Sequence, residues 1–247
     1  MSGFAVLPLA SGSPVIPSFG SPHQFDCERS NRLFCVSWLR QNWSAVLWPA
    51  LRQHILLTAV SVAIGFVIAM ALALLVHRFR HAERPVTAFT SFLYTIPALA
   101  LFELLVPVPG LGLSATTAVV ALVAYSLLIL ERNILAGLRA VPDEVRSAAL
   151  SLGMSGRQML FKVDLPLALP AIVAGLRIAT VSTIALATVA ALVANQGLGV
   201  PILAAISDGV FKTELISAGT LAVCLAVAAD AALVGLQRLL MPWVRAV

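Results

Sequence analysis

Residues Ile55–Val76 form a run of 22 residues without an acidic or basic side chain. About 20 consecutive apolar residues are enough for an α-helix to cross the hydrocarbon core of a bilayer. The composition agrees with this reading, because 60% of the residues are hydrophobic and only 11% are charged, whereas soluble domains average about 25% charged residues. The sequence therefore predicts an integral membrane protein.

Four further hydrophobic stretches follow the first, so we expect an all-α integral membrane fold with about five transmembrane helices. The expected spans are Ile55–Val76, Thr87–Val106, Leu111–Leu130, Leu167 to about Val193, and Ile216–Leu236. Pro97 should break the second span. Between the last two, Pro201–Thr213 is too short and too polar to cross, which favours a re-entrant or surface-lying connection.

The residues before the first span form an N-terminal extension, residues 1–49. Its first 22 residues are rich in Pro, Ser and Gly, which is typical of a disordered tail. Asn31–Trp48 mixes apolar side chains with arginines and predicts an amphipathic helix at the membrane interface, with Trp38, Trp43 and Trp48 at headgroup depth. A sixth span is the alternative, but its arginines disfavour it. The transmembrane domain is expected over residues 50–240, and a short tail over 241–247.

Neither the cysteines nor the histidines are spaced as metal ligands. Cys27 and Cys35 would pair if both faced an oxidising compartment, but three cysteines define no disulfide framework, and unpaired thiols are the favoured interpretation. No His-Glu-x-x-His motif is present, and His77 and His81 lie in a basic turn at a membrane edge. We expect no bound metal. The net charge of +5 lacks the interleaved aromatic residues of a nucleic-acid surface, so we expect lipid contact and no nucleic acid.

The basic residues divide unequally between the two sides of the membrane. One side carries ten of those near the spans, namely Arg78, Arg80, Arg84, Arg132, Arg139, Arg146, Arg157, Lys162, Arg238 and Arg245. The other carries Arg40, Arg52 and Lys212. Cytoplasmic loops hold the excess of Lys and Arg. This predicts a multi-pass protein of the cytoplasmic (inner) membrane, with the N-terminus outside and the C-terminus in the cytoplasm.

A polar helical segment, residues 142–166, separates the third and fourth spans. Pro142 suits the start of a helix, and Asp143 and Glu144 follow at the positive end of its dipole. The helix is expected to run to Leu152, with Ala148, Ala149 and Leu152 on one shallow apolar face. Gly153 should end it. A second turn, Arg157–Val163, is expected to stop at Leu165-Pro166.

This segment resembles the cytoplasmic coupling loop, or EAA loop, of ABC importer permeases. The pattern appears as Ser147-Ala148-Ala149, Gly153, Val163 and Leu165-Pro166, with both spacings kept and serine in place of the usual glutamate. An ordinary amphipathic loop helix is the alternative. The resemblance implies that an ATPase partner is contacted through Asp143, Glu144, Arg146, Ser147, Ala148, Ala149, Leu152, Gly153, Val163, Leu165 and Pro166.

Two charged side chains are expected inside the membrane. Arg177 lies about ten residues, or roughly 15 Å, into the fourth span, where a lone arginine is costly. Asp230 lies in the fifth span within reach, so we expect an ion pair that ties the two spans together. A possible translocation pathway includes Glu103, Ser182, Thr183 and Thr188, although Ser and Thr often only pack helices and Glu103 suits the outer membrane edge.

The resemblance extends over roughly residues 50–240 and narrows to the permeases of quaternary-amine importers for glycine betaine, choline and carnitine. The stretches that carry it are Thr95–Phe102, Pro107–Gly112, Lys162–Pro170 and Gly175–Val181. It implies a permease dimer of two copies or of two paralogues, two ATPase subunits and an extracytoplasmic binding protein. ATP and Mg would bind to the ATPase, and this chain itself would bind no cofactor.

Other transporter classes remain as alternatives. The chain lacks the GxxxxGK[ST] phosphate loop, so we expect a non-catalytic subunit. An ABC permease for another small solute, such as methionine or a sulfonate, would share the coupling loop. An ion-coupled secondary transporter should show internal inverted repeats, and none is visible.

Overall fold

The structure is a computed structural model that describes Cys27 and residues 30–241. Every regular element in that part of the chain is helical, which confirms the all-α prediction. The elements are α2 (Val36–Asn42), η1 (Trp43–Leu47), α3 (Trp48–Arg78), η2 (Arg80–Ala82), α4 (Glu83–Thr95), α5 (Ala98–Leu105), α6 (Ala115–Arg139), α7 (Asp143–Ser151), α8 (Gly156–Met159), η3 (Leu160–Asp164), α9 (Leu165–Val189), α10 (Ala191–Ala194), α11 (Gly199–Ser207) and α12 (Lys212–Leu240). The predicted N-terminal tail, residues 1–22, lies outside the described residues, as does the predicted C-terminal tail, residues 241–247, apart from Met241.

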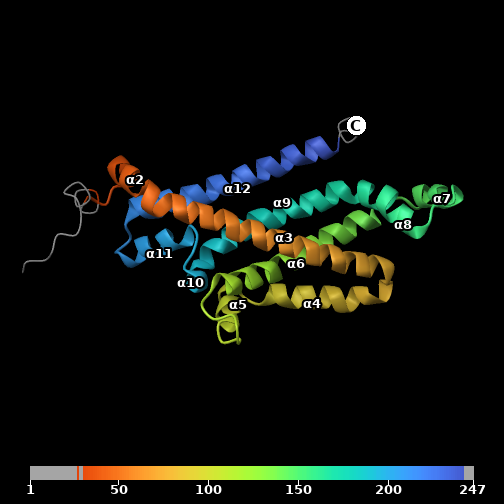
Figure 1. Ribbon diagram of the computed structural model, residues 1–247, viewed down its shortest axis with the longest axis horizontal. Helices are drawn as coiled ribbons and strands as arrows, with labels where there is room; N and C mark the ends of the chain where they lie inside the picture. The colour runs from red at the N-terminus through yellow and green to blue at the C-terminus, as the bar shows by residue number, and fades with distance from the viewer. Residues whose placement is uncertain (1–26, 28–29, 242–247) are drawn as a thin grey trace, which may run out of the picture.

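Four helical stretches in the described part are long and apolar enough to cross a membrane. They are Val36–Arg78, Ala115–Arg139, Gly156–Val189 and Lys212–Leu240. A fifth crossing results if Arg80–Thr95 and Ala98–Leu105, which bend by 96° at their junction, count as one broken span. The long helices run side by side along the molecule, with α7 at one end and α2 and α11 at the other (Figure 1).

The expected interfacial helix is not separate from the first span. α2, η1 and α3 join into one helix of 43 residues, Val36–Arg78. Pro49 sits in the first turn of α3 and would break the hydrogen-bond ladder of a regular helix. The π-helical turn η1 absorbs this defect, because the Trp48 N–H donates to the Trp43 carbonyl five residues back. Trp43 and Trp48 are exposed, but Trp38 is buried and packs edge-on against Phe211 with ring centroids 5.5 Å apart.

A similar π-helical turn corrects the prediction that Leu165-Pro166 ends a helix. Leu165 has helical dihedral angles, and the helix continues from Gly156 to Val189. The turn η3 carries the chain past Pro166, since the Leu165 N–H reaches back to the Leu160 carbonyl. Pro166 is therefore accommodated without an interruption of the helix.

Pro97 does break the second span, as its position predicts. Ile96 and Pro97 are both extended, with ψ of 127° and 137°. The Tyr125 hydroxyl of α6 donates a hydrogen bond to the Ile96 carbonyl, so the opened backbone has a partner. Irregular backbone at membrane depth needs such a partner, or a cavity, in place of the missing ladder bonds.

Helices α3, α6 and α9 form the central core, where small residues let them approach closely. Ala69, Ala73, Ala168 and Ala179 are buried among them. At Gly175 of α9, an added Cβ would lie 2.4 Å from the Cβ of Asn133, so only glycine fits. The close approach of small residues is the usual means of helix association in membranes.

The end of the molecule opposite α7 is tied together by His54 and by a disulfide. His54 is fully buried, accepts from the Leu198 N–H at Nδ1, and therefore donates from Nε2 to the Ile184 carbonyl. Cys27 and Cys35 form a disulfide, so the favoured interpretation of two unpaired thiols is wrong. Their Cα atoms lie 6.1 Å apart, within the usual range for a disulfide. Cys224 is free and exposed.

Candidate functional site

Helix α7 is a short lever with defined ends. Pro142 is extended with ψ of 142°, and Asp143 and Glu144 occupy the first turn, as the sequence predicts. Gly153 has φ of +77°, a conformation that favours glycine. Its N–H donates to Leu150 O, and the Met154 N–H donates to Ala149 O at 3.2 Å, which completes a Schellman motif. The helix therefore ends within one residue of its expected end.

The exposed side of α7 carries apolar side chains beside polar and acidic ones. Leu152 is 79% exposed and Leu150 is 59% exposed, and Ala148 and Ser147 also face outward. Ala149 is buried, so the structure divides the predicted face: Ala149 packs inward, whereas Ala148 and Leu152 point away from the helix bundle. Asp143 and Glu144 are exposed beside them. Exposed leucines at the tip of a protruding helix are typical of a contact surface for another protein.

Arg146 attaches α7 to the rest of the molecule. Its Nε lies 3.0 Å from Asp164 Oδ1 in η3, and its Nη2 donates to the Leu138 carbonyl at the end of α6. Asp164 is buried, and its other oxygen lies 3.5 Å from His77 Nε2 of α3. One arginine and one carboxylate therefore join α7 to three membrane helices.

Asp164 and His77 are not among the site residues predicted from the sequence. Asp164 lies two residues after Lys162, before the expected start of the fourth span, so the sequence does not show that its carboxylate is buried. The predicted coupling-loop positions Val163, Leu165 and Pro166 lie around it, partly buried at the π-helical turn and the start of α9. They shape the base of the lever and are not on its exposed tip.

Arg177 and Asp230, which we expected to pair, lie together in the structure. The guanidinium approaches the carboxylate with both nitrogens, Nε to Oδ1 at 2.8 Å and Nη2 to Oδ2 at 2.9 Å. The pair joins α9 to α12, and about a third of each side chain is exposed. A bidentate arginine–carboxylate pair fixes orientation as well as charge.

Two of the four candidate pathway residues line one pocket. Ser182 and Thr183 of α9 share a pocket of about 290 Å³ with Tyr94 of α4 and Tyr125 of α6. The Thr183 hydroxyl donates to the Ala179 carbonyl, a bond within its own helix. Thr188 and Glu103 are not among the residues that line this pocket. The Thr188 hydroxyl bonds to Ala185 O, and Glu103 is exposed on α5.

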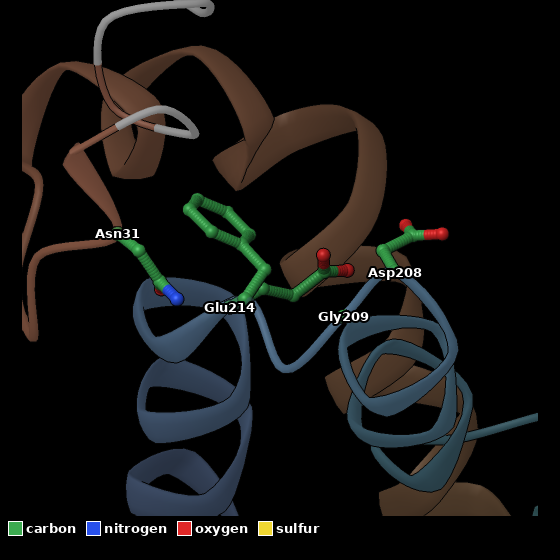
Figure 2. A pocket seen from close by; sticks show the side chains of 5 residues that line it. Asn31, Asp208, Gly209 and Glu214 are labelled. Atoms are coloured by element: carbon green, nitrogen blue, oxygen red, sulfur yellow. The ribbon is translucent and has the colours of Figure 1, made fainter.

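A second pocket, which the sequence analysis did not anticipate, lies at the α11 end. Asn31, Asp208, Gly209, Phe211 and Glu214 line a space of about 250 Å³. Figure 2 shows Asp208 at the end of α11 and Glu214 at the start of α12, with Asn31 on the segment that precedes α2. Asn31 holds the α11–α12 connection, because its side chain bonds to Val210 O and to the Lys212 N–H.

Across Cys27 and residues 30–241, no cluster of three His, Cys, Asp or Glu side chains is placed to hold a metal ion.

The family model and the similar proteins of known function agree on one family. Residues 53–246 match the model of the binding-protein-dependent transport system inner membrane component. The chain is 36% identical over 194 residues to the osmoprotectant import permease protein OsmW of Salmonella typhimurium, covering 77% of this chain and 89% of that one. It is 35% identical to the choline transport system permease protein OpuBD of Bacillus subtilis, covering 84% and 90%.

Solved structures share the fold. The MetNI methionine ABC transporter in an inward-facing conformation aligns with a TM-score of 0.70 at 23% identity, over 83% of this chain and 97% of that one. At this identity the likeness concerns the fold alone. The family model over residues 53–246 and the relatives at 35–36% identity assign the protein: it belongs to the binding-protein-dependent transport system inner membrane components, the permease subunits of ABC importers.

Proposed function

We propose that this chain forms the membrane pathway of an ATP-driven importer for quaternary-amine osmoprotectants of the glycine betaine, choline and carnitine class. The substrate class is supported by relatives at 30–36% identity, which include an osmoprotectant import permease and choline transport permeases. The proposal that this chain is coupled to an ATPase rests on the geometry of α7, a capped lever with exposed leucines at the end of the bundle.

The proposed assembly contains two permease chains, two ATPase subunits and an extracytoplasmic binding protein. ATP and Mg bind the ATPase, and this chain is a non-catalytic subunit. The α7 end faces the cytoplasm, and the disulfide end faces outward, where an oxidising compartment preserves the Cys27–Cys35 bond. The excess of basic residues around α7 supports the same orientation.

In this mechanism, closure of the ATPase dimer moves α7 as a rigid body. The Arg146–Asp164 pair transmits that movement to η3 and to the ends of α6 and α3, because it bonds to all of them directly or through His77. The π-helical turn η3 lies between the lever and α9. The membrane helices then open outward and accept substrate from the binding protein.

The test is uptake of radiolabelled choline and glycine betaine into proteoliposomes that hold the chain with its ATPase and binding protein. Uptake should require hydrolysable ATP and should persist when ionophores collapse sodium and proton gradients. Gradient-driven uptake without ATP would indicate a secondary transporter. ATP-driven uptake of methionine or a sulfonate, without uptake of quaternary amines, would show that the proposed substrate class is wrong.

A further inference from the structure

We propose that the pocket between α4, α6 and α9 is a transient binding site for the quaternary ammonium group, with Tyr94 and Tyr125 as its cation-binding surface. This inference rests on the proposed function, since it names where in the permease that substrate is held. The lining residues that would contact the solute include Tyr94, Tyr125, Ser182 and Thr183.

The pocket lies near the middle of the membrane, where a transported solute would bind during its passage. Tyr125 is ten residues along α6 from Ala115, roughly 15 Å, which is about halfway across the hydrocarbon core. The broken backbone at Ile96-Pro97 lies beside it, held by the Tyr125 hydroxyl. A helix broken at membrane depth is tolerated where it is buried in protein or lines a cavity, and here a pocket adjoins the break.

The chemistry of the lining suits an alkylated cation. The rings of Tyr94 and Tyr125 meet edge to face with centroids 5.8 Å apart, and both residues line the pocket. A quaternary ammonium group has no N–H to donate, and the electron-rich faces of aromatic rings are its usual partners in proteins. The residues that line the pocket include no charged side chain.

The hydroxyl side of the pocket suits the other end of such a molecule. Ser182 and Thr183 lie on α9, across from the tyrosines, and the Thr183 hydroxyl already donates to Ala179 O. Ser182 can donate to the hydroxyl or carboxylate of a choline-like or betaine-like solute. A volume of about 290 Å³ is near the lower bound for small-molecule pockets.

The absence of a lining carboxylate makes the site weak, which transport requires. A pathway site must bind well enough for entry and loosely enough for exit. Two aromatic faces without a counter-charge give an attraction of that kind. The high-affinity selection step then belongs to the separate binding protein.

The direct test measures choline binding to the permease–ATPase complex without its binding protein. The complex is placed in nanodiscs of phosphatidylethanolamine and phosphatidylglycerol, and saturation-transfer NMR follows the trimethyl protons of added choline. The uncharged isostere 3,3-dimethylbutan-1-ol is the second probe. We expect a signal for choline and a much weaker one for the isostere, because only choline carries the charge that the rings attract.

Tyr94 is the residue to change, because the Tyr125 hydroxyl also holds the backbone. Tyr94→Leu should weaken choline binding roughly tenfold, and Tyr94→Phe should remain within about threefold of the wild type because it keeps the ring face. The matched control is Phe92→Leu, an aromatic residue of the same helix that is 64% exposed and does not line the pocket. It should bind as the wild type does.

Equal binding of the isostere, or equal binding by Tyr94→Leu and Phe92→Leu, would overturn the inference. Competition by added phosphatidylcholine would also overturn it, since the site would then take a lipid headgroup. These failures are distinct from failure of the proposed function. If the wild type shows ATP-driven choline uptake but Tyr94→Leu binds and transports normally, only the pocket assignment is wrong.

Discussion

Two arginine–aspartate pairs join different helices of the molecule. Arg146–Asp164 holds the α7 lever, and Arg177–Asp230 holds α12 against α9. They differ in burial, because Asp164 is 3% exposed whereas both partners of the second pair are about one third exposed. Their removal should therefore have different consequences.

Arg146→Ala should destabilise the protein by about 3 kcal/mol, since it leaves the buried Asp164 carboxylate without its main partner. The matched control is Asp143→Ala, which removes a 95% exposed carboxylate 3.7 Å from the same arginine and should change stability by less than about 1 kcal/mol. Thermal unfolding of the purified complex measures both. We expect Tm to fall by roughly 6–12 °C for Arg146→Ala, and similar values for the two variants would contradict the account.

Arg177→Asp and Asp230→Arg should each reduce transport, because each places two like charges next to each other between α9 and α12. The double variant restores an ion pair in reversed order. Uptake by the double variant should exceed that of either single variant. A double variant as inactive as the single ones would show that the two side chains do not act as a pair.

The sequence could predict one of these pairs and not the other. Arg177 lies deep in an apolar span, so its need for a partner is visible in the sequence, and Asp230 is the acidic residue within reach. Asp164 lies near the membrane edge, where water is an available partner. Its contacts come from α7, α6 and α3, and that convergence follows only from the packed structure.

At the scale of the elements, Pro97 interrupts a helix whereas Pro49 and Pro166 do not. Pro97 follows an ordinary α-helix and produces the 96° bend. Pro49 and Pro166 follow π-helical turns, and the helices continue. The local rule for the residue before proline predicts the first case and misses the other two, because a π-helical turn depends on tertiary packing. The end of α7 depends only on neighbouring residues in the sequence, and the sequence therefore predicts it.

The segment from Cys27 to Trp38 should depend on its disulfide. The loop covers the α11–α12 connection through Asn31 and through the Trp38–Phe211 contact. Breaking a short disulfide-closed loop costs about 2 kcal/mol. Amide hydrogen exchange of residues 30–42 should therefore accelerate by roughly thirtyfold on reduction.

Peptides from α6 should exchange at an unchanged rate on reduction, and Cys224→Ala should behave as the wild type, because Cys224 is free. Unchanged exchange over residues 30–42 after reduction would show that the loop is held without the disulfide.

At the scale of the whole molecule, the account requires α7 and α11 on opposite sides of the membrane, as the two ends of the bundle suggest (Figure 1). Ser151→Cys at the end of α7 and Ser207→Cys at the end of α11 are matched, since both replace an exposed serine. In a Cys224→Ala background, a membrane-impermeant maleimide should label Ser207→Cys in intact cells. It should label Ser151→Cys only after permeabilisation, and the reverse pattern would invert the orientation.

The central claim is that α7 is the contact for an ATPase, and co-purification tests it most directly. The tagged chain is compared as wild type, Leu152→Asp and Leu113→Asp. Leu152 is 79% exposed on α7, and Leu113 is 72% exposed on the loop before α6, so neither substitution disturbs a core. The account predicts that an ATPase subunit co-purifies with the wild type and with Leu113→Asp and is lost with Leu152→Asp. Equal recovery of the ATPase with all three chains, or with none, would contradict it.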